Sequence, residues 1–130
     1  AATAPSRAPS QAKAPAASAA PARAVISDRE AEDLYRRGLA SLRSGRTDDA
    51  LRYWELVWSA RPDYREVAAN LKREYLARGL EAFAVGRLNE AIQQWERVLR
   101  IDPNDARARG YLERAEQQRA KSREILGSTP

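Results

Sequence analysis

Residues 38–62 read GLASLRSGRTDDALRYWELVWSARP, and residues 79–103, 41 positions later, read GLEAFAVGRLNEAIQQWERVLRIDP. At this offset, rare and conformationally special residues coincide, since glycines, tryptophans and prolines fall on their own kind. The matches are Gly38 with Gly79, Gly45 with Gly86, Arg46 with Arg87, Ala50 with Ala91, Trp54 with Trp95, Glu55 with Glu96, Val57 with Val98 and Pro62 with Pro103. So many matches at one offset are very improbable by chance, and the chain therefore contains an internal repeat.

Each unit of the repeat predicts two helices. Ser27 and Glu30 have the spacing of a capping box, and we expect a helix from there to about Ser44, ending before Gly45. A second helix is expected from Thr47 or Asp48 to just before Pro62, with apolar residues three and four positions apart. We expect the remaining helices over residues 63–85, from about residue 89, and from Asp102-Pro103 to Leu126. No segment alternates with period two, so the prediction is an all-α fold.

The residues at these positions resemble the tetratricopeptide repeat. With Ala31 as position 1 of a 34-residue unit, Gly38, Ala50, Trp54 and Pro62 fall at positions 8, 20, 24 and 32. With Lys72 as position 1, the same positions hold Gly79, Ala91, Trp95 and Pro103. The resemblance covers residues 31–64 and 72–105 and implies two helix-turn-helix units followed by a helix that either caps the stack or begins a lost third unit. It also implies that Trp54 and Trp95 are buried and fill the space between neighbouring pairs.

Two features depart from that family. The period is seven residues longer than 34, and we expect residues 65–71 to lengthen the helix that opens the second unit by nearly two turns. Position 7, usually Leu, is Arg37 and Arg78, whose stems are expected to cover apolar surface while their charges reach water.

Residues 1–24 have a different composition from the rest. They contain 12 Ala and 4 Pro, three basic residues, no acid, and no Leu, Ile, Val or aromatic residue. Such a segment cannot bury enough apolar surface to offset its ordering entropy, so we expect a disordered linker at 1–24 and a helical domain at 25–130. The linker either ties the domain to an envelope anchor or joins it to another domain. The whole chain lacks Met, so we expect a processed product or an internal fragment.

The composition excludes most catalytic and metal chemistry. The chain has no His and no Cys, so nucleophilic catalysis with histidine and cysteine-based metal sites are absent. The acids at helix starts are interpreted as caps, and no glycine loop for phosphate or calcium loop is present. We therefore predict no enzyme, no cofactor, no metal and no small-molecule substrate. The net charge of +5 comes largely from the first 24 residues, which makes nucleic acid an improbable partner.

The resemblance also indicates where a partner binds. In tetratricopeptide proteins the first helix of each unit lines a concave groove, and its expected positions here are apolar in both units. The candidate groove residues are Tyr35 at the edge and Leu39, Leu42, Leu76, Leu80 and Phe83. An apolar groove suits an amphipathic helix or an extended apolar segment. Alternatively, the fifth helix or a second copy covers the stripe. Trp58 is a second candidate contact, because Leu99 replaces it in the next unit.

These features predict a non-enzymatic protein–protein interaction module. The partner is a protein or peptide segment, with a second copy of the chain as an alternative. An Ala/Pro tether carrying such repeats resembles bacterial envelope-assembly proteins of secretion and pilus systems, which implies the periplasm or cell envelope, with a membrane reached only through a tether outside the chain. The alternative function is binding of a polyanion, nucleic acid or an acidic cell-wall polymer, through the basic tail and surface Arg residues.

Deleting residues 1–24 tests the division of the chain. Because the segment lacks large apolar side chains, the thermal midpoint measured by circular dichroism should stay nearly unchanged. A fall of more than about five degrees, roughly 1 kcal/mol for a domain of this size, would show that the segment packs on the helices.

Overall fold

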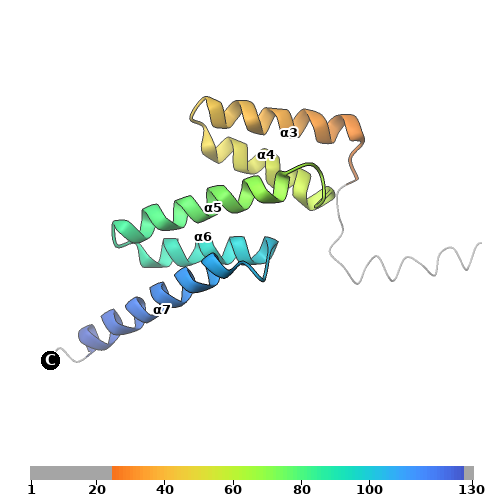
Figure 1. Cartoon of the computed structure of the whole chain (residues 1–130). Coiled ribbons are helices and arrows are strands. Elements are labelled where there is room, and N and C mark those ends of the chain that lie inside the picture. The colour runs from red at the N-terminus through yellow and green to blue at the C-terminus, as the bar shows by residue number, and fades with distance from the viewer. Residues whose placement is uncertain (1–24, 128–130) are drawn as a thin grey trace, which may run out of the picture.

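The computed structural model describes residues 25–127, which fold into five α-helices packed in chain order (Figure 1). The helices are α3 (Asp28–Arg43), α4 (Thr47–Ala60), α5 (Val67–Ala84), α6 (Leu88–Ile101) and α7 (Ala106–Gly127). No strand occurs within residues 25–127, so the all-α prediction is confirmed. The expected linker at 1–24 lies outside the described residues.

The helix ends follow local chemistry. Ser27 N–H donates to Glu30 Oε1 at 2.8 Å and Glu30 N–H donates to Ser27 Oγ at 3.1 Å, which confirms the capping box of α3. Gly45 and Gly86 have φ values of 77° and 82°, a left-handed conformation that glycine adopts without steric cost. These two glycines close the helices of each pair into tight antiparallel hairpins.

The prediction for the third helix was wrong at its start. It begins at Val67 rather than residue 63, and its 18 residues exceed α3 by two. Only part of the seven-residue insertion is therefore helical, and Arg65, with φ of 43°, lies in the link between α4 and α5. The link stays outside the helix because Tyr64 and Arg65 turn back to bind Glu32 on α3.

The fifth helix also begins later than predicted. Asp105, not Asp102, caps it, since Asp105 Oδ1 accepts from Ala108 N–H at 2.9 Å. Asp102 is engaged elsewhere: it accepts a hydrogen bond from Asn104 N–H at 3.1 Å and one from Lys72 Nζ at 2.8 Å. The turn that these contacts form moves the first residue of α7 to Ala106.

Trp54 and Trp95 are 0% and 1% exposed, which confirms their predicted burial. Each indole lies against a glycine of its own helix pair, and a Cβ added to Gly38 or Gly79 would sit 2.2 Å from the indole nitrogen. The indole N–H groups donate to the carbonyl oxygens of Tyr35 and Leu76, at 3.3 and 3.4 Å. Each ring also reaches the next helix of the stack, since Trp54 shares a cluster with Val67 and Leu71 of α5 and the Trp95 ring lies 5.2 Å from that of Tyr111 on α7, so the rings lie within their own pairs and extend to the following one as expected.

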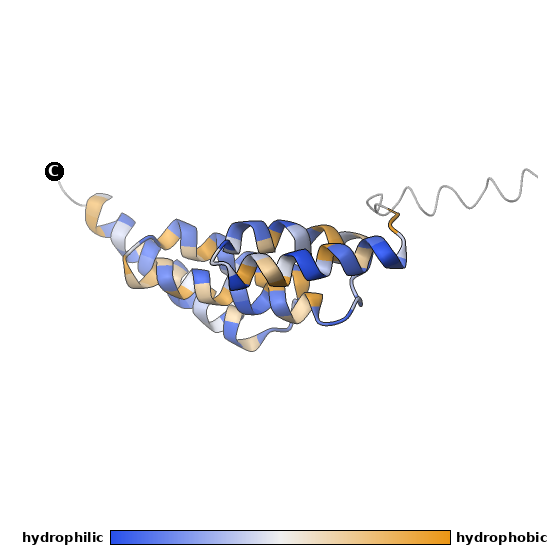
Figure 2. Cartoon of the chain, turned by 90° about the horizontal axis from the view of Figure 1, so that it is seen from above, coloured by the Kyte–Doolittle hydropathy of each residue, from blue (hydrophilic) through white to orange (hydrophobic). Residues whose placement is uncertain are grey.

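Buried residues form two clusters joined at α5. The first contains Trp54, Val57, Val67 and Leu71, and the second contains Ile92 and Trp95; half-buried Leu76 contacts both. Figure 2 shows that each helix is apolar on part of its surface and hydrophilic on the rest. None of the described helices is long and apolar enough to cross a membrane.

Helix α7 extends the stack. Its Ala108, Tyr111, Leu112 and Ala115 pack into the two clusters, and the Tyr111 ring lies 5.2 Å from that of Trp95. In Figure 1, α7 runs beside α6 and away from α3. Helix α7 therefore packs on α6, at the end of the stack where a capping helix was expected.

Glu32 connects α3 to the link before α5. It accepts hydrogen bonds from Tyr64 Oη, from Arg36 Nε at 2.7 Å and from Arg65 Nε at 2.8 Å. These donors, the Tyr64 hydroxyl first and then Arg36 and Arg65, favour the carboxylate and lower the pKa of Glu32 to about 2.

Gly79→Ala should destabilise the protein, because the new methyl group overlaps the Trp95 indole. Overpacking of this kind costs about 1–3 kcal/mol, measured as the change in unfolding free energy in urea. Gly110→Ala is the control: nothing lies within 4 Å of its added Cβ, and alanine in a helix interior should stabilise by about 0.5–1 kcal/mol. Equal effects of the two substitutions would contradict the packing of Trp95 against Gly79.

Glu32→Gln should lower the thermal midpoint at neutral pH. As the pH is lowered, the midpoint of this variant should fall less steeply than that of the wild type. Because the folded pKa is lowered from 4.5 to about 2, the wild-type carboxylate stabilises the fold above pH 4.5 and loses this contribution as the pH falls toward 2. The measurement is the thermal midpoint across this range. Glu116→Gln, at an exposed glutamate of α7, is the control. If the thermal midpoint fell as steeply with decreasing pH in Glu32→Gln as in this control, the lowered pKa of Glu32 would not contribute to stability.

Candidate functional site

The six candidate groove residues lie on two first helices of the repeat. Tyr35, Leu39 and Leu42 come from α3, and Leu76, Leu80 and Phe83 come from α5, in both cases with steps of four and three residues that place them on one helix face. Leu39 and Leu42 are half-buried against the first cluster, and Phe83 is half-buried against the second. Leu80 is the most exposed of the set, at 44%. We call Leu39, Leu42, Leu76, Leu80 and Phe83 the inner stripe.

Tyr35 belongs to the core rather than to the edge of a groove. It is 8% exposed, its hydroxyl accepts a hydrogen bond from Asn70 Nδ2 at 3.3 Å, and its ring meets that of Tyr64 edge-on at 5.9 Å. The prediction missed this because the contact with Tyr64 joins residues 29 positions apart, and at the position of Tyr64 the second unit has Asp105, which cannot form such a ring contact. Little of the Tyr35 ring is left for a partner.

Helix α7 leaves the inner stripe open at Leu80. Helix α7 packs mainly on α6, with a hydrogen bond from Arg119 Nη1 to Asn89 Oδ1 at 3.0 Å, and its Tyr111 and Leu112 pack in the same cluster as Leu76 and Phe83, whereas Leu80 stays 44% exposed. The alternative in which the fifth helix covers the stripe therefore does not apply to Leu80.

Trp58 is half-buried and packs against the first cluster. The guanidinium carbon of Arg100 lies 5.2 Å from its ring centroid, a cation–π contact, so part of the ring is covered within the chain. Leu56, two positions earlier on α4, is 54% exposed and offers more apolar surface to the outside.

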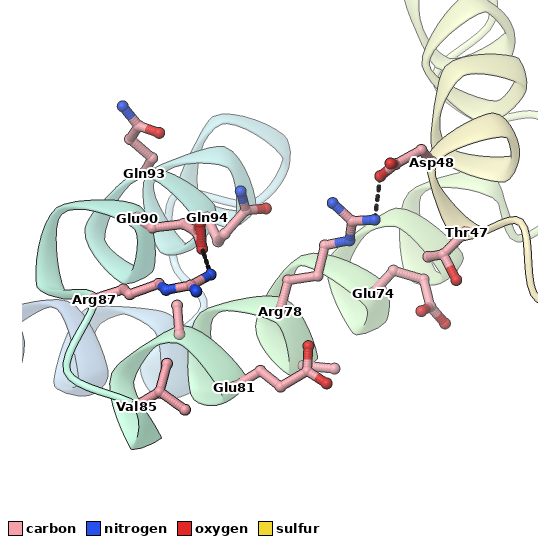
Figure 3. A pocket seen from close by; sticks show the side chains of 12 residues that line it. Thr47, Asp48, Glu74, Arg78, Glu81, Val85, Arg87, Glu90, Gln93 and Gln94 are labelled. Carbon is pink, nitrogen blue, oxygen red and sulfur yellow. Dashed lines mark hydrogen bonds and ion pairs between the residues drawn. The ribbon is translucent and has the colours of Figure 1, made fainter.

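On another side of α5 lies a polar hollow of about 740 Å³, which the sequence analysis did not predict. We call it the interpair hollow because it lies between the first and second helix pairs (Figure 3). It is lined by Thr47 and Asp48 of α4, by Glu74, Ala77, Arg78, Glu81 and Ala82 of α5 with Val85 after it, and by Glu90, Gln93 and Gln94 of α6 with Arg87 before it.

The hollow forms because the contacts of α5 with α4 change along the helix, from apolar packing to an ion pair. Val67, Leu71 and Tyr75 are buried in the first cluster with residues of α4. Farther along, Arg78 forms an ion pair with Asp48 of α4, and Val85 is 68% exposed. The apolar packing of α5 on α4 thus lies in the first part of α5, with Val98 of α6 joining the same cluster.

Gln94 is the unusual residue of this hollow. It is 7% exposed, yet its Oε1 has no hydrogen-bond partner in the described part of the chain. Buried polar atoms of native proteins nearly always have a partner. A signal was present in the sequence: Gln94 follows Ala91 by three residues and precedes Val98 by four, so it lies on the apolar face of α6.

A second hollow, of about 920 Å³, lies beyond the Arg78–Asp48 pair, which lines both. Its charges are largely paired within the chain. Glu55 accepts from Arg100 Nη2 at 2.6 Å and from the Tyr75 hydroxyl, and Arg97 lies over the Tyr75 ring at 5.6 Å. Burial, followed by the bond to Glu55, raises the pKa of Tyr75, so this phenol stays protonated.

Among residues 25–127 no group of three or more acidic side chains is arranged to hold a metal ion. The inner stripe and the two hollows are the candidate binding surfaces within residues 25–127.

Comparison with known proteins identifies one repeat. The model of the tetratricopeptide repeat matches residues 73–105, which span α5 from its second turn, α6 and the turn after it. No curated protein matches the chain. The family match does not extend to residues 31–64, where the likeness stays the one predicted from the 41-residue period. Residues 73–105 thus form a tetratricopeptide repeat, a module for protein–protein interaction that is typically non-catalytic.

Proposed function

We propose that the chain is a non-enzymatic adaptor that binds an apolar or amphipathic segment of a partner protein along the inner stripe. The observation that carries this proposal is the exposure of Leu80, at 44%, on a helix face whose other members are half-buried leucines and a phenylalanine. The tetratricopeptide repeat at 73–105 supports a protein as the partner.

The spacing of the stripe favours a helix as the bound segment. Leu76, Leu80 and Phe83 follow one another by four and three residues along α5, and Leu39 and Leu42 contribute a second row from α3. Rows of side chains at these spacings form ridges and grooves that accept apolar side chains of another helix at positions i, i+3, i+4 and i+7. Burial of apolar surface drives such docking, at about 25 cal/mol per Å² before the costs of association.

The proposed setting is an assembly of the bacterial envelope, such as a secretion or pilus system. Its support is the composition of residues 1–24, where alanine, four prolines and few other residue types make a spacer of the kind that separates a working domain from its anchor.

A second candidate is polyanion binding, and α7 is the feature that favours it. Between residues 28 and 105 ten arginines form ion pairs with acids of the same chain. No ion pair within residues 25–127 involves α7, which carries Arg107, Arg109, Arg114, Arg119, Lys121 and Arg123 against three glutamates. Binding through these charges would weaken log-linearly with salt, whereas binding through the inner stripe would hardly respond.

Leu80→Glu should abolish capture of the partner from extracts of the source cell by the full chain immobilised through residues 1–24. The carboxylate would be desolvated in the complex without a counter-charge. Helicity and thermal midpoint should change little, because Leu80 is already 44% exposed.

Leu56→Glu is the matched control, since Leu56 is an equally large, 54% exposed leucine on α4, and this variant should bind as the wild type does. Unchanged binding by Leu80→Glu would refute the inner stripe as the site. Unfolding of this variant would place Leu80 in the core, and conversion of a dimer to monomers in sedimentation would identify a second copy as the occupant.

A further inference from the structure

The interpair hollow has the chemistry of a receptor for a positively charged side chain. Four carboxylates line it, those of Asp48, Glu74, Glu81 and Glu90, against the two guanidinium groups of Arg78 and Arg87. The excess of negative charge is concentrated between two helix pairs, where the dielectric constant is lower than in bulk water and charges act more strongly.

The carboxylates of the hollow differ in how closely they are paired with cations of the same chain. Asp48 is paired with Arg78, but the pair of Glu90 with Arg87 spans 4.0 Å and that of Glu74 with Arg73 spans 3.5 Å. The carboxylate of Glu81 makes no hydrogen bond or ion pair within residues 25–127. At least one negative charge of the hollow is therefore available to a ligand.

Gln94 adds an observation that is independent of charge. Its Oε1 is buried and lacks a donor, and Figure 3 shows its side chain on the part of α6 that faces Arg78 and Asp48. Leaving a buried carbonyl oxygen without a donor costs free energy, and the cost is recovered when a ligand supplies an N–H group. An arginine side chain supplies five N–H donors and a positive charge, and lysine supplies three.

From this combination we propose that the interpair hollow binds a basic side chain, arginine in preference to lysine, presented by a partner protein. Gln94 Oε1 accepts one N–H group and Glu81 compensates the charge. The site is separate from the inner stripe, since its residues on α5 (Glu74, Arg78, Glu81) lie on a different side of the helix from Leu76, Leu80 and Phe83. It is a second point of contact that does not depend on the inner stripe.

The test uses the full chain labelled with ¹⁵N and the capped tripeptide acetyl-Ala-Arg-Ala-amide as the probe. We expect saturable shifts of the Gln94 side-chain amide and of the backbone amides of Glu81 and Ala82, with an affinity of roughly millimolar order for one charged contact. The lysine tripeptide should bind more weakly, and the glutamate tripeptide should cause no saturable shift.

Glu81→Gln and Gln94→Leu should each lower the affinity for the arginine probe about tenfold, because each removes one charge-assisted or buried hydrogen bond. Glu96→Gln is the matched control, an exposed glutamate of α6 outside the hollow, and should leave the affinity unchanged. Wild-type dispersion of the spectra will show that each variant is folded.

Three results would overturn the proposal. The first is no saturable shift at about 20 mM probe, as expected if a water molecule satisfies Gln94. The second is binding that Glu81→Gln and Glu96→Gln weaken equally. The third is a shift of the Gln94 amide in the unliganded chain when Arg7, Lys13 and Arg23 are changed to Gln, which would identify the chain's own N-terminal segment as the occupant.

Discussion

The contact between an indole and a glycine sets the geometry of each helix pair. In both units the Trp side chain occupies the space that a Cβ would need, at Gly38 and at Gly79, and donates its N–H group to a backbone carbonyl 19 residues earlier. The helices of a pair can approach this closely only where one of them has no side chain. Both pairs have the same internal contact. The structural differences within the domain therefore lie in the links and in the contacts between the two pairs.

Charged contacts tie the link that follows each pair to the first helix of the same pair. After α4 the chain returns to the start of α3, where Arg61 bonds Asp28 and the Ile26 carbonyl, and Arg65 bonds Glu32. After α6 it returns to α5, where Lys72 lies 2.8 Å from Asp102 and 3.2 Å from Asp105. The signs are reversed: the first link brings cations to acids, and the second brings acids to a cation. Hydrogen bonding to Asp102 is the main cause that raises the pKa of Lys72, so the second link retains its charge.

The two faces of α5 differ in chemistry, since one is apolar and the other is polar. One presents Leu80 among half-buried apolar side chains, and the other presents Glu81 beside the buried Gln94. The division follows from α5 packing its first part against α4 through Val67, Leu71 and Tyr75, while Arg78 farther along forms an ion pair with Asp48. The two proposed sites use different side chains of α5, so occupation of one does not require side chains of the other.

Local sequence determined the helices, their pairing and the burial of both tryptophans, because capping at Ser27, left-handed glycines and a repeated apolar spacing act over a few residues. It also placed the inner stripe on one face, since helical periodicity alone does so. Tertiary structure decided the rest. Tyr35 became core, and α5 began at Val67, because Tyr64 and Arg65 reach Glu32 more than 30 residues away. The position of Gln94 on the apolar face of α6 could be read from the sequence, but the interpair hollow beside it could not, because the hollow depends on how closely two helix pairs approach, and that distance is set by contacts between residues remote in the chain.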